Sequence, residues 1–327
     1  MLFTSTLTLG TLISISSQSW LGMWMGLEIN LLSMIPLINH SNNMMASEAS
    51  IKYFIVQALA STILLFSIIL LVNKTTAEHL SYSILFNTAL LTKMGAAPFH
   101  FWFPEVIEGL TWMNSLILLT WQKIAPMIII MYNNTPMLFM FIIVSCMMIS
   151  GVMGINQMSL RKILAYSSIN HIGWMIAALM FSENIWMYYF SVYTIITMNI
   201  ILIISQINVY SLNQLYMSMS ENHMLKMFFI LNFMSLGGLP PFLGFFPKWI
   251  TIQTMSINST LLIALVMIIM TLMTLFFYMR ITFSTILLSS QMNKIYFPNN
   301  KQLSTTLVFN FISIMGLIMC TVAFNIM

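Results

Sequence analysis

Charged residues are scarce in this sequence of 327 residues. Only 6% are Asp, Glu, Lys or Arg, whereas 59% are hydrophobic, and soluble domains carry about 25% charged residues. So few charges cannot cover the surface of a chain this long, which excludes a water-soluble fold. The hydrophobic runs are continuous rather than alternating, which excludes an outer-membrane β-barrel. We therefore expect an all-α polytopic membrane protein.

Cysteine and aspartate are also scarce. Cys146 and Cys320 lie far apart within hydrophobic runs, and aspartate does not occur at all. Two isolated cysteines exclude a CxxC pair and the usual zinc or iron–sulfur ligand sets. The motifs of nucleotide, dinucleotide and HExxH zinc sites are missing as well. We expect no cofactor and no metal in this chain, and no nucleic-acid partner.

The charge-free stretches predict where the chain crosses the membrane. A hydrocarbon core takes about 20 residues per helix, so the charge-free runs 124–160 and 184–220 must each be divided. Asn133–Pro136 divides the first run, because proline lacks an N–H and asparagine favours turns. We predict about eleven spans, near 2–17, 20–38, 53–72, 81–101, 113–132, 136–153, 162–181, 185–206, 226–254, 259–280 and 304–326.

Basic residues are distributed unequally between the two sets of loops. We assume that the two termini lie on opposite sides of the membrane. The loops on the side of the N-terminus then carry the basic residues Lys52, Arg161, Lys162, Lys226, Arg280, Lys294 and Lys301. The loops on the side of the C-terminus carry only Lys74. This asymmetry follows the positive-inside rule, so we expect the N-terminus in the positive-inside compartment and the C-terminus opposite.

Four charged residues lie within predicted spans: Glu28, Lys93, Lys123 and Lys248. A charge at the bilayer centre costs about 2.5–3.5 kcal/mol on insertion scales. One alternative is structural, with ion pairs or lysines whose ammonium groups reach the interface. One glutamate cannot neutralise three lysines, however. Since desolvation disfavours the charged form of a lysine, the pattern favours a proton pathway through the membrane.

Glycine and proline interrupt two of the predicted spans. The first break is GAAP, which ends at Pro98, and the second is GGLPP, which contains Gly238, Pro240 and Pro241. Broken spans in corresponding parts of two halves are typical of inverted-repeat transporters. Lys93 precedes its break and Lys248 follows the other, as opposite topology of two repeats would produce. The alternative is that the prolines only kink the helices for packing. That alternative does not explain why a lysine lies beside each break.

Four segments then resemble the antiporter-like subunits of respiratory complex I. They are KMGAAPFHFWFPEVIEGLTW (93–112), WQKIAP (121–126), SLRKILAYSSINHIGWM (159–175) and LGGLPPFLGFFPKW (236–249). The resemblance extends over essentially the whole chain and is weakest beyond residue 281. It implies a single antiporter-like domain over 1–327, with inverted five-helix repeats at about 1–132 and 136–280 and a C-terminal helix at about 304–326.

The resemblance also implies roles for individual residues. Glu28, Lys93, Lys123, His171 and Lys248 match the family's chain of proton-transferring groups. The chain would be a core membrane subunit of NADH:ubiquinone oxidoreductase that relays protons while electrons pass from NADH to ubiquinone in other subunits. It would count as part of that enzyme without a redox site of its own. NAD, FMN, iron–sulfur clusters and ubiquinone would belong to those other subunits.

The resemblance further implies partners and a location. The partners would be other membrane-arm subunits, including the other antiporter-like chains, and membrane phospholipid such as cardiolipin. The location would be the mitochondrial inner membrane, with the N-terminus in the matrix and the C-terminus in the intermembrane space. The 34 methionines and the scarcity of arginine are typical of an AT-rich mitochondrial code, so we expect the chain to be mitochondrially encoded.

Other interpretations stay open at this point. A stand-alone or Mrp-type cation/proton antiporter subunit would need intramembrane carboxylates besides Glu28, and a purely structural subunit would not need the buried lysines. A lipid-modifying enzyme lacks a nucleophile–base pair. We expect His100 and Trp102 to hold the first broken helix in place, and Glu105 to belong to a solvated face.

Overall fold

The computed structural model describes residues 2–39, 43–72, 79–219, 223–240, 242–287 and 310–311. Within these ranges the regular structure is helical, apart from one isolated bridge between Ser159 and Ser211. The helices are α1 (Leu2–Ser16), α2 (Trp20–Ile38), α3 (Met44–Val72), α4 (His79–Met94), α5 (Trp102–Gly109), α6 (Trp112–Leu119), α7 (Trp121–Met131), α8 (Pro136–Ile155), α9 (Leu160–Phe181), α10 (Glu183–Ile207), α11 (Leu212–Ser218), α12 (His223–Gly237), α13 (Phe245–Ile257) and α14 (Leu261–Leu287).

The expected all-α membrane fold is confirmed for the described part of the chain. Seven helical stretches there are long and apolar enough to cross a membrane: Trp20–Ile38, Met44–Val72, Trp112–Met131, Pro136–Ile155, Leu160–Phe181, Glu183–Ile207 and Leu261–Leu287. The count of about eleven spans and the arrangement as inverted repeats stay predictions. The C-terminal helix predicted at 304–326 lies outside the described residues, except for 310–311.

Helix ends follow local capping chemistry where the sequence provides it. The hydroxyl of Ser19 accepts a hydrogen bond from the N–H of Gly22 (3.2 Å) and so caps α2, which occupies its predicted range. The predicted division at Asn133–Pro136 is confirmed, because α7 ends at Met131 and α8 begins at Pro136. Proline suits the first helical position, where no intrahelical N–H bond is needed.

The third predicted span, 53–72, is too short at its beginning, because α3 begins at Met44. The carbonyl of Asn43 accepts bonds from the N–H groups of Ala46 and Ser47 and starts the helix. Glu48 and Lys52 then form an i,i+4 ion pair of 2.8 Å, an arrangement that stabilises helices. The helix therefore extends beyond its hydrophobic stretch.

The predicted span over 113–132 is confirmed as the membrane-length stretch Trp112–Met131. Within it, Thr120 (φ −115°, ψ −68°) separates α6 from α7. The Thr120 hydroxyl donates to the carbonyl of Leu116 (2.7 Å), and such side-chain bonds to the preceding turn bend helices. Hydropathy records only how apolar a stretch is, so it could not indicate this break.

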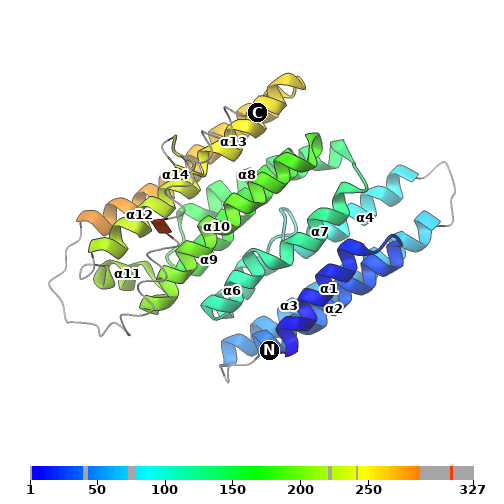
Figure 1. Ribbon diagram of the computed structural model, residues 1–327, viewed down its shortest axis with the longest axis horizontal. Helices are drawn as coiled ribbons and strands as arrows, with labels where there is room; N and C mark the ends of the chain where they lie inside the picture. The colour runs from blue at the N-terminus through cyan, green and yellow to red at the C-terminus, as the bar shows by residue number, and fades with distance from the viewer. Residues whose placement is uncertain are drawn as a thin grey trace. The chain divides into compact units, whose positions relative to one another are not determined.

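The chain forms two compact units, Met1–Cys146 and Met147–Met327. In the first unit, α1 and α2 run side by side as a hairpin (Figure 1). Gly10 and Gly26 face each other there, so closely that a Cβ on Gly26 would lie 2.7 Å from the carbonyl oxygen of Gly10. Helix α3 packs against α2, α4 and α5, while α7 packs against α1, α2, α4 and α6. These contacts place α4 and α7 next to each other.

The second unit is built around α9. Every residue from 163 to 179 is buried, and α9 packs against α10, α13 and α14 (Figure 1). A helix that is buried all round and still carries Ser167, Asn170 and His171 must satisfy those polar groups within the protein.

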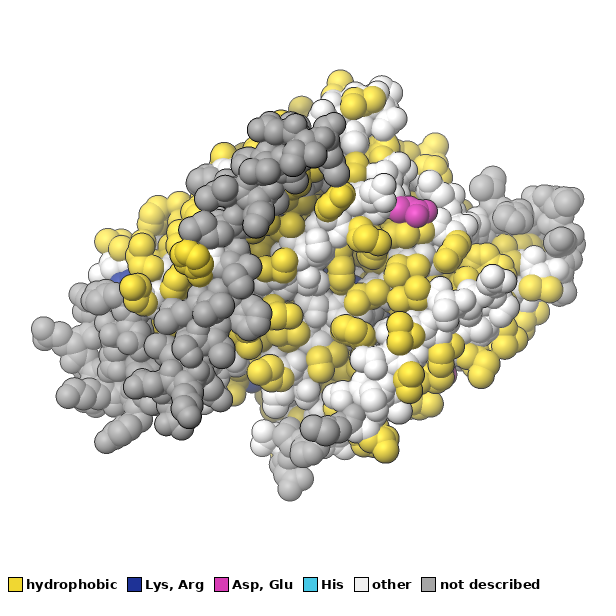
Figure 2. Space-filling view, in the orientation of Figure 1, with side chains coloured by type: hydrophobic (Ala, Val, Ile, Leu, Met, Phe, Trp, Pro, Cys, Tyr) yellow, Lys and Arg dark blue, Asp and Glu magenta, His cyan; other side chains and the backbone are white. Residues whose placement is uncertain are grey.

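Apolar side chains also dominate the outer surface. Figure 2 shows hydrophobic side chains spread over the described helices, with few charged groups on that face. Leu59, Leu265 and Phe276 are among the exposed residues, each more than half accessible. Apolar exposure on this scale is typical of a surface that contacts lipid.

Candidate functional site

The first break follows directly after Lys93. Gly95 takes φ +73°, its N–H donates to the carbonyl of Thr92 (3.1 Å), and the N–H of Ala96 donates to the carbonyl of Leu91 (3.0 Å). These two bonds form a Schellman motif, in which glycine occupies the left-handed position. Lys93 therefore lies in the last turn of α4.

Two neighbouring side chains of α8 bind the backbone of the break. The hydroxyl of Ser145 donates to the carbonyl of Ala97 (2.9 Å). The N–H of Ala97 in turn donates to the sulfur of Cys146 (3.2 Å). Irregular backbone within a membrane needs such partners inside the protein.

His100 and Trp102 close the break from its other end. The indole N–H of Trp102 donates to the carbonyl of Thr92 (3.1 Å), and Nδ1 of His100 lies 3.2 Å from the carbonyl oxygen of Pro98. The expectation that these two residues hold the broken helix in place is confirmed.

Glu28 and Lys93 form a separated pair of opposite charges in the first unit. Neither Oε2 of Glu28 nor Nζ of Lys93 has a hydrogen-bond partner within the described ranges, although both atoms are buried. The ammonium of Lys93 is thus not fixed by a direct contact within these ranges.

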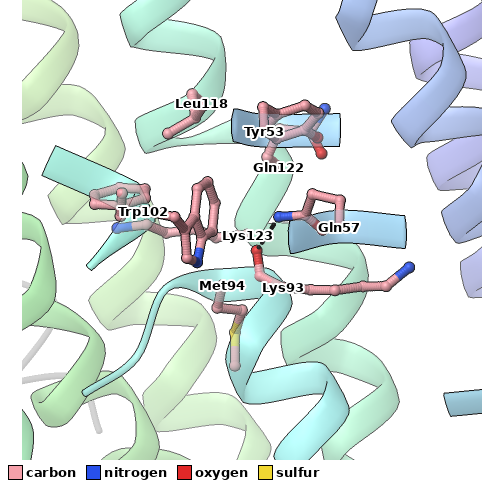
Figure 3. Close-up of a pocket in the computed structure, with 9 residues that line it drawn as sticks. Tyr53, Gln57, Lys93, Met94, Trp102, Leu118, Gln122 and Lys123 are labelled. Atoms are coloured by element: carbon pink, nitrogen blue, oxygen red, sulfur yellow. Dashed lines mark hydrogen bonds between the residues drawn. The ribbon is translucent and has the colours of Figure 1, made fainter. Parts of the chain in front are cut away.

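Lys93 and Lys123 both line one pocket of the first unit. It is lined by Tyr53, Gln57, Lys93, Met94, Trp102, Phe103, Leu118, Gln122 and Lys123. The centre of a water molecule can occupy about 10 Å³ of it, which is roughly the space that one water needs. In Figure 3 the amide of Gln57 donates to the main-chain carbonyl of Lys93 (3.1 Å). The Lys93 side chain extends from there away from Trp102.

Lys123 lies in a weakened part of α7. It is only 1% exposed, and its ammonium lies 5.7 Å from the centre of the Phe103 ring. Thr120 interrupts the helix before it, and Pro126 cannot donate to the carbonyl of Gln122. Gln122 and Lys123 both line the pocket, so polar backbone and side-chain groups meet at this point.

The second break repeats the geometry of the first. Gly238 takes φ +76°, and its N–H donates to the carbonyl of Ser235 (3.0 Å). The N–H of Leu239 donates to the carbonyl of Met234 (3.4 Å). These are again the bonds of a Schellman motif. Pro240 follows the motif, whereas the predicted break residue Pro241 lies outside the described residues.

Lys248 closes this second break. Its ammonium donates to the carbonyls of Leu236 (3.2 Å) and Gly237 (3.0 Å) at the end of α12, where the helix dipole favours a cation. The same ammonium lies 5.9 Å from the centre of the Trp174 ring in α9. Lys248 thus has direct partners, which Lys93 lacks among the described residues.

His171 lies in the buried centre of α9 and is 4% exposed. Its Nδ1 lies 2.9 Å from the hydroxyl of Tyr189 in α10, and its ring lies 5.0 Å from that of Tyr193. Trp174, which contacts Lys248, is one turn further along α9. The ammonium of Lys248 therefore lies against α9 about one turn away from His171.

The structure groups the predicted site residues within each unit. The first unit brings together Glu28, Lys93 and Lys123, and the second contains His171 and Lys248. Sequence reasoning missed the polar side chains around them, namely Tyr53, Gln57, Gln122, Cys146, Tyr189 and Tyr193. Only the spacing of Tyr189 and Tyr193, four residues apart on one helical face, offered a signal.

A charged cluster lies outside the pocket. The ammonium of Lys52 contacts Glu105 (2.7 Å) and Glu48 (2.8 Å), and all three side chains are largely exposed. The cluster joins α3 to α5, the helix that follows the first break. The expectation that Glu105 lies on a solvated face is confirmed.

The described ranges contain no group of three His, Cys, Asp or Glu side chains that could hold a metal ion. The buried polar residues are mainly serines, threonines and amides, together with three lysines (Lys93, Lys123 and Lys248) and two histidines (His100 and His171). Such groups donate, accept or carry protons. The chemistry that this arrangement supports is proton transfer.

Comparison with known proteins gives consistent matches. Residues 17–274 match the family described as NADH:quinone oxidoreductase/Mrp antiporter, TM. The chain is 48% identical over 334 residues to NADH-ubiquinone oxidoreductase chain 2 of Anopheles gambiae, covering 100% of this chain and 98% of that protein. It is 44% identical over 333 residues to the chain 2 of Locusta migratoria, with coverage of 100% and 97%.

Two solved structures share the fold. A chain of respiratory complex I from Thermus thermophilus with bound aureothin matches with a TM-score of 0.89 and 22% identity, over 97% of this chain and 77% of that chain. A chain of the Mrp complex from Dietzia matches with a TM-score of 0.80 and 15% identity, over 97% and 75%. At these identities the matches establish the antiporter-like fold alone.

Proposed function

Since the chain belongs to the NADH:quinone oxidoreductase/Mrp antiporter family, we propose that it is a core membrane subunit of proton-pumping NADH:ubiquinone oxidoreductase. Its part in that enzyme is to relay protons across the membrane. The observation that carries this proposal is the pocket that Lys93 and Lys123 both line, because a water-sized space offers a route from a protonated Lys93 to a neutral Lys123.

The relay begins with Glu28 and Lys93. An ionised carboxylate attracts a protonated Lys93, since opposite charges within about 4–6 Å favour the charged forms. Displacement or neutralisation of Glu28 removes that attraction. Lys93 then passes its proton through the pocket to the neutral amine of Lys123, so that one N–H bond breaks as another forms.

The relay continues in the second unit through His171 and Lys248. Histidine suits this position because its unperturbed pKa of about 6.5 lets imidazole carry a proton near neutral pH. Lys248 ends the series at the second break, where carbonyls of α12 accept its N–H groups. The two units would form inverted five-helix repeats, each with one broken helix, within about eleven spans.

The energy for the relay comes from electron transfer in other subunits. We assign NAD, FMN, iron–sulfur clusters and ubiquinone to those subunits, and the other membrane-arm subunits are the partners of this chain. The location is the mitochondrial inner membrane, with the N-terminus in the matrix. The basic loop residues Arg161 and Lys162 are suited to contact cardiolipin, because anionic headgroups attract basic residues near the membrane surface.

A cation/proton antiporter subunit is the second candidate. The fold match to the Mrp complex of Dietzia favours it, but Glu28 is the one carboxylate inside a predicted span, and cation sites use several oxygen ligands. Sodium flux through the purified assembly distinguishes the two, because a relay of lysines and histidine carries protons only.

Replacement of Lys123 tests the relay. In the intact complex, Lys123→Ala should lower proton pumping at least roughly tenfold, as expected for loss of an essential proton carrier. Electron transfer from NADH to an artificial acceptor should stay unchanged, because it does not pass through this chain. The measurement is acidification of the vesicle lumen beside NADH oxidation.

The matched control is Lys226→Ala, which removes an exposed lysine whose ammonium donates to the carbonyl of Ile286. This variant should pump normally. An unchanged ratio of protons to electrons in the Lys123→Ala complex would contradict the relay.

A further inference from the structure

A hydroxyl group contacts the imidazole of His171. The oxygen of Tyr189 lies 2.9 Å from Nδ1 of His171, while the two ring planes meet at 56° with their centres 5.9 Å apart. The contact between these residues is therefore made by the phenol hydroxyl and not by ring stacking.

A second tyrosine hydroxyl close by points elsewhere. Tyr193 is one turn after Tyr189 on α10, and its ring is the nearer of the two to His171. Its hydroxyl bonds to the side chain of Ser168, and the Ser168 hydroxyl also contacts the carbonyl of Ala165 (2.8 Å).

Asn170, the residue before His171, makes another polar contact of α9. The amide of Asn170 donates to the hydroxyl of Thr274 in α14 (3.2 Å). The helices packed against α9 are α10, α13 and α14. The titratable side chains that they bury are Tyr189, Tyr193, Lys248 and Tyr278.

A hydroxyl is suited to a residue that changes its protonation state. While Nε2 gains and loses a proton, Nδ1 keeps its hydrogen, because a neutral imidazole still carries one N–H. The oxygen of Tyr189 accepts from that N–H in both states, whereas an ammonium could only donate and would exclude a hydrogen from Nδ1. The bond between Tyr189 and His171 can therefore persist while a proton arrives and leaves.

We propose that Tyr189 is a positioning residue for His171, an inference that rests on the proposed proton relay. Its hydroxyl stays hydrogen-bonded to Nδ1 in both protonation states and so fixes the orientation of the ring. Nε2 is then the nitrogen that takes a proton from the relay and releases it again. One N–H bond at Nε2 forms and breaks in each passage, and Tyr189 keeps its own proton throughout.

Tyr189→Phe in the intact complex tests this assignment, with Tyr193→Phe as the matched control. Each change removes one buried hydroxyl from the same helix, and the first removes the 2.9 Å bond to Nδ1 of His171. Proton pumping per assembled complex should fall roughly fivefold in Tyr189→Phe, the effect of one lost hydrogen bond on a rate. Tyr193→Phe should pump at least twice as fast as Tyr189→Phe.

The pH profile of pumping separates positioning from simple structural damage. It should change its midpoint in Tyr189→Phe and keep it in Tyr193→Phe, because the Tyr189 hydroxyl contacts Nδ1 of the imidazole while that of Tyr193 bonds to Ser168. The double variant Tyr189→Phe, His171→Ala should pump no more slowly than His171→Ala alone, since Tyr189 acts through His171. The amount of assembled complex is measured by NADH oxidation with an artificial acceptor.

The outcomes distinguish this inference from the proposed function. Slow pumping in His171→Ala with normal pumping and an unchanged pH profile in Tyr189→Phe overturns the role of Tyr189 and leaves the relay standing. Equal losses in Tyr189→Phe and Tyr193→Phe with unchanged profiles also overturn it, because both hydroxyls would then act only in packing. Normal pumping in both His171→Ala and Lys123→Ala overturns the relay itself.

Discussion

At the scale of residues, the buried lysines differ in what surrounds them. Lys248 donates to two carbonyls at the end of α12, whereas the ammonium of Lys93 has no hydrogen-bond partner among the described residues. The sequence grouped them as similar charges at similar depth. Their partners make Lys248 a group that also caps a helix, and Lys93 the group that is less firmly held.

Gly238 provides a test of how closely Lys248 is held. A Cβ at this position would lie 2.8 Å from Nζ of Lys248, and φ is +76°. Gly238→Ala should therefore displace the ammonium from its carbonyls, with backbone strain of about 1–2 kcal/mol. We expect slower proton pumping and a lower thermal midpoint for the complex.

Gly237→Ala is the control for that variant. The nearest atom to a Cβ there is in Tyr278 at 3.6 Å, an ordinary contact, and no positive φ occurs. This neighbouring change should leave pumping within about twofold of the unsubstituted rate. Equal losses in the two variants would show that the position of Lys248 is not what matters.

At the scale of elements, both breaks are helix ends built in the same way. Gly95 and Gly238 close Schellman motifs, and each is followed by a proline and a new helix. The sequence predicted both breaks, because glycine and proline have strong local effects. It could not predict the division at Thr120 or the early start of α3 at Met44, since these depend on one side-chain bond and on one exposed ion pair.

The exposed cluster around Lys52 should contribute little to the position of α5. Glu105→Gln removes its 2.7 Å ion pair, and exposed pairs are weak and screened by salt. Hydrogen–deuterium exchange of α5 should accelerate by no more than about fivefold at low salt and not at all at high salt. A larger effect that persists at high salt would mean that the cluster holds the broken helix in place.

At the scale of the whole molecule, residues on segments predicted to share a membrane face contact each other. Lys52 meets Glu105 on one predicted face of the first unit, and Asn133 donates to the carbonyl of Ser83 (3.3 Å) near the opposite one. In the second unit, Arg280 donates to the carbonyl of Gln157 (3.2 Å). These contacts fit the predicted alternation of loops.

Sidedness can be measured with cysteines placed in two exposed loops. Asn156 lies near the basic residues of the second unit and Asn258 between α13 and α14. In sealed membranes, a membrane-impermeant maleimide should label Asn156→Cys from the positive-inside face and Asn258→Cys from the opposite face. Labelling of both from one face would refute the predicted topology, and the unsubstituted complex gives the background.

The sequence by itself determined the class of protein, most helices, the two glycine–proline breaks and the charged residues inside the membrane. Each of these follows from local chemistry: hydropathy over about 20 residues, backbone geometry, and the cost of a buried charge. Only the tertiary structure decided which groups meet. Gln57 and Lys93, or Tyr189 and His171, lie on different helices, and their contacts arise from packing, which no local pattern encodes.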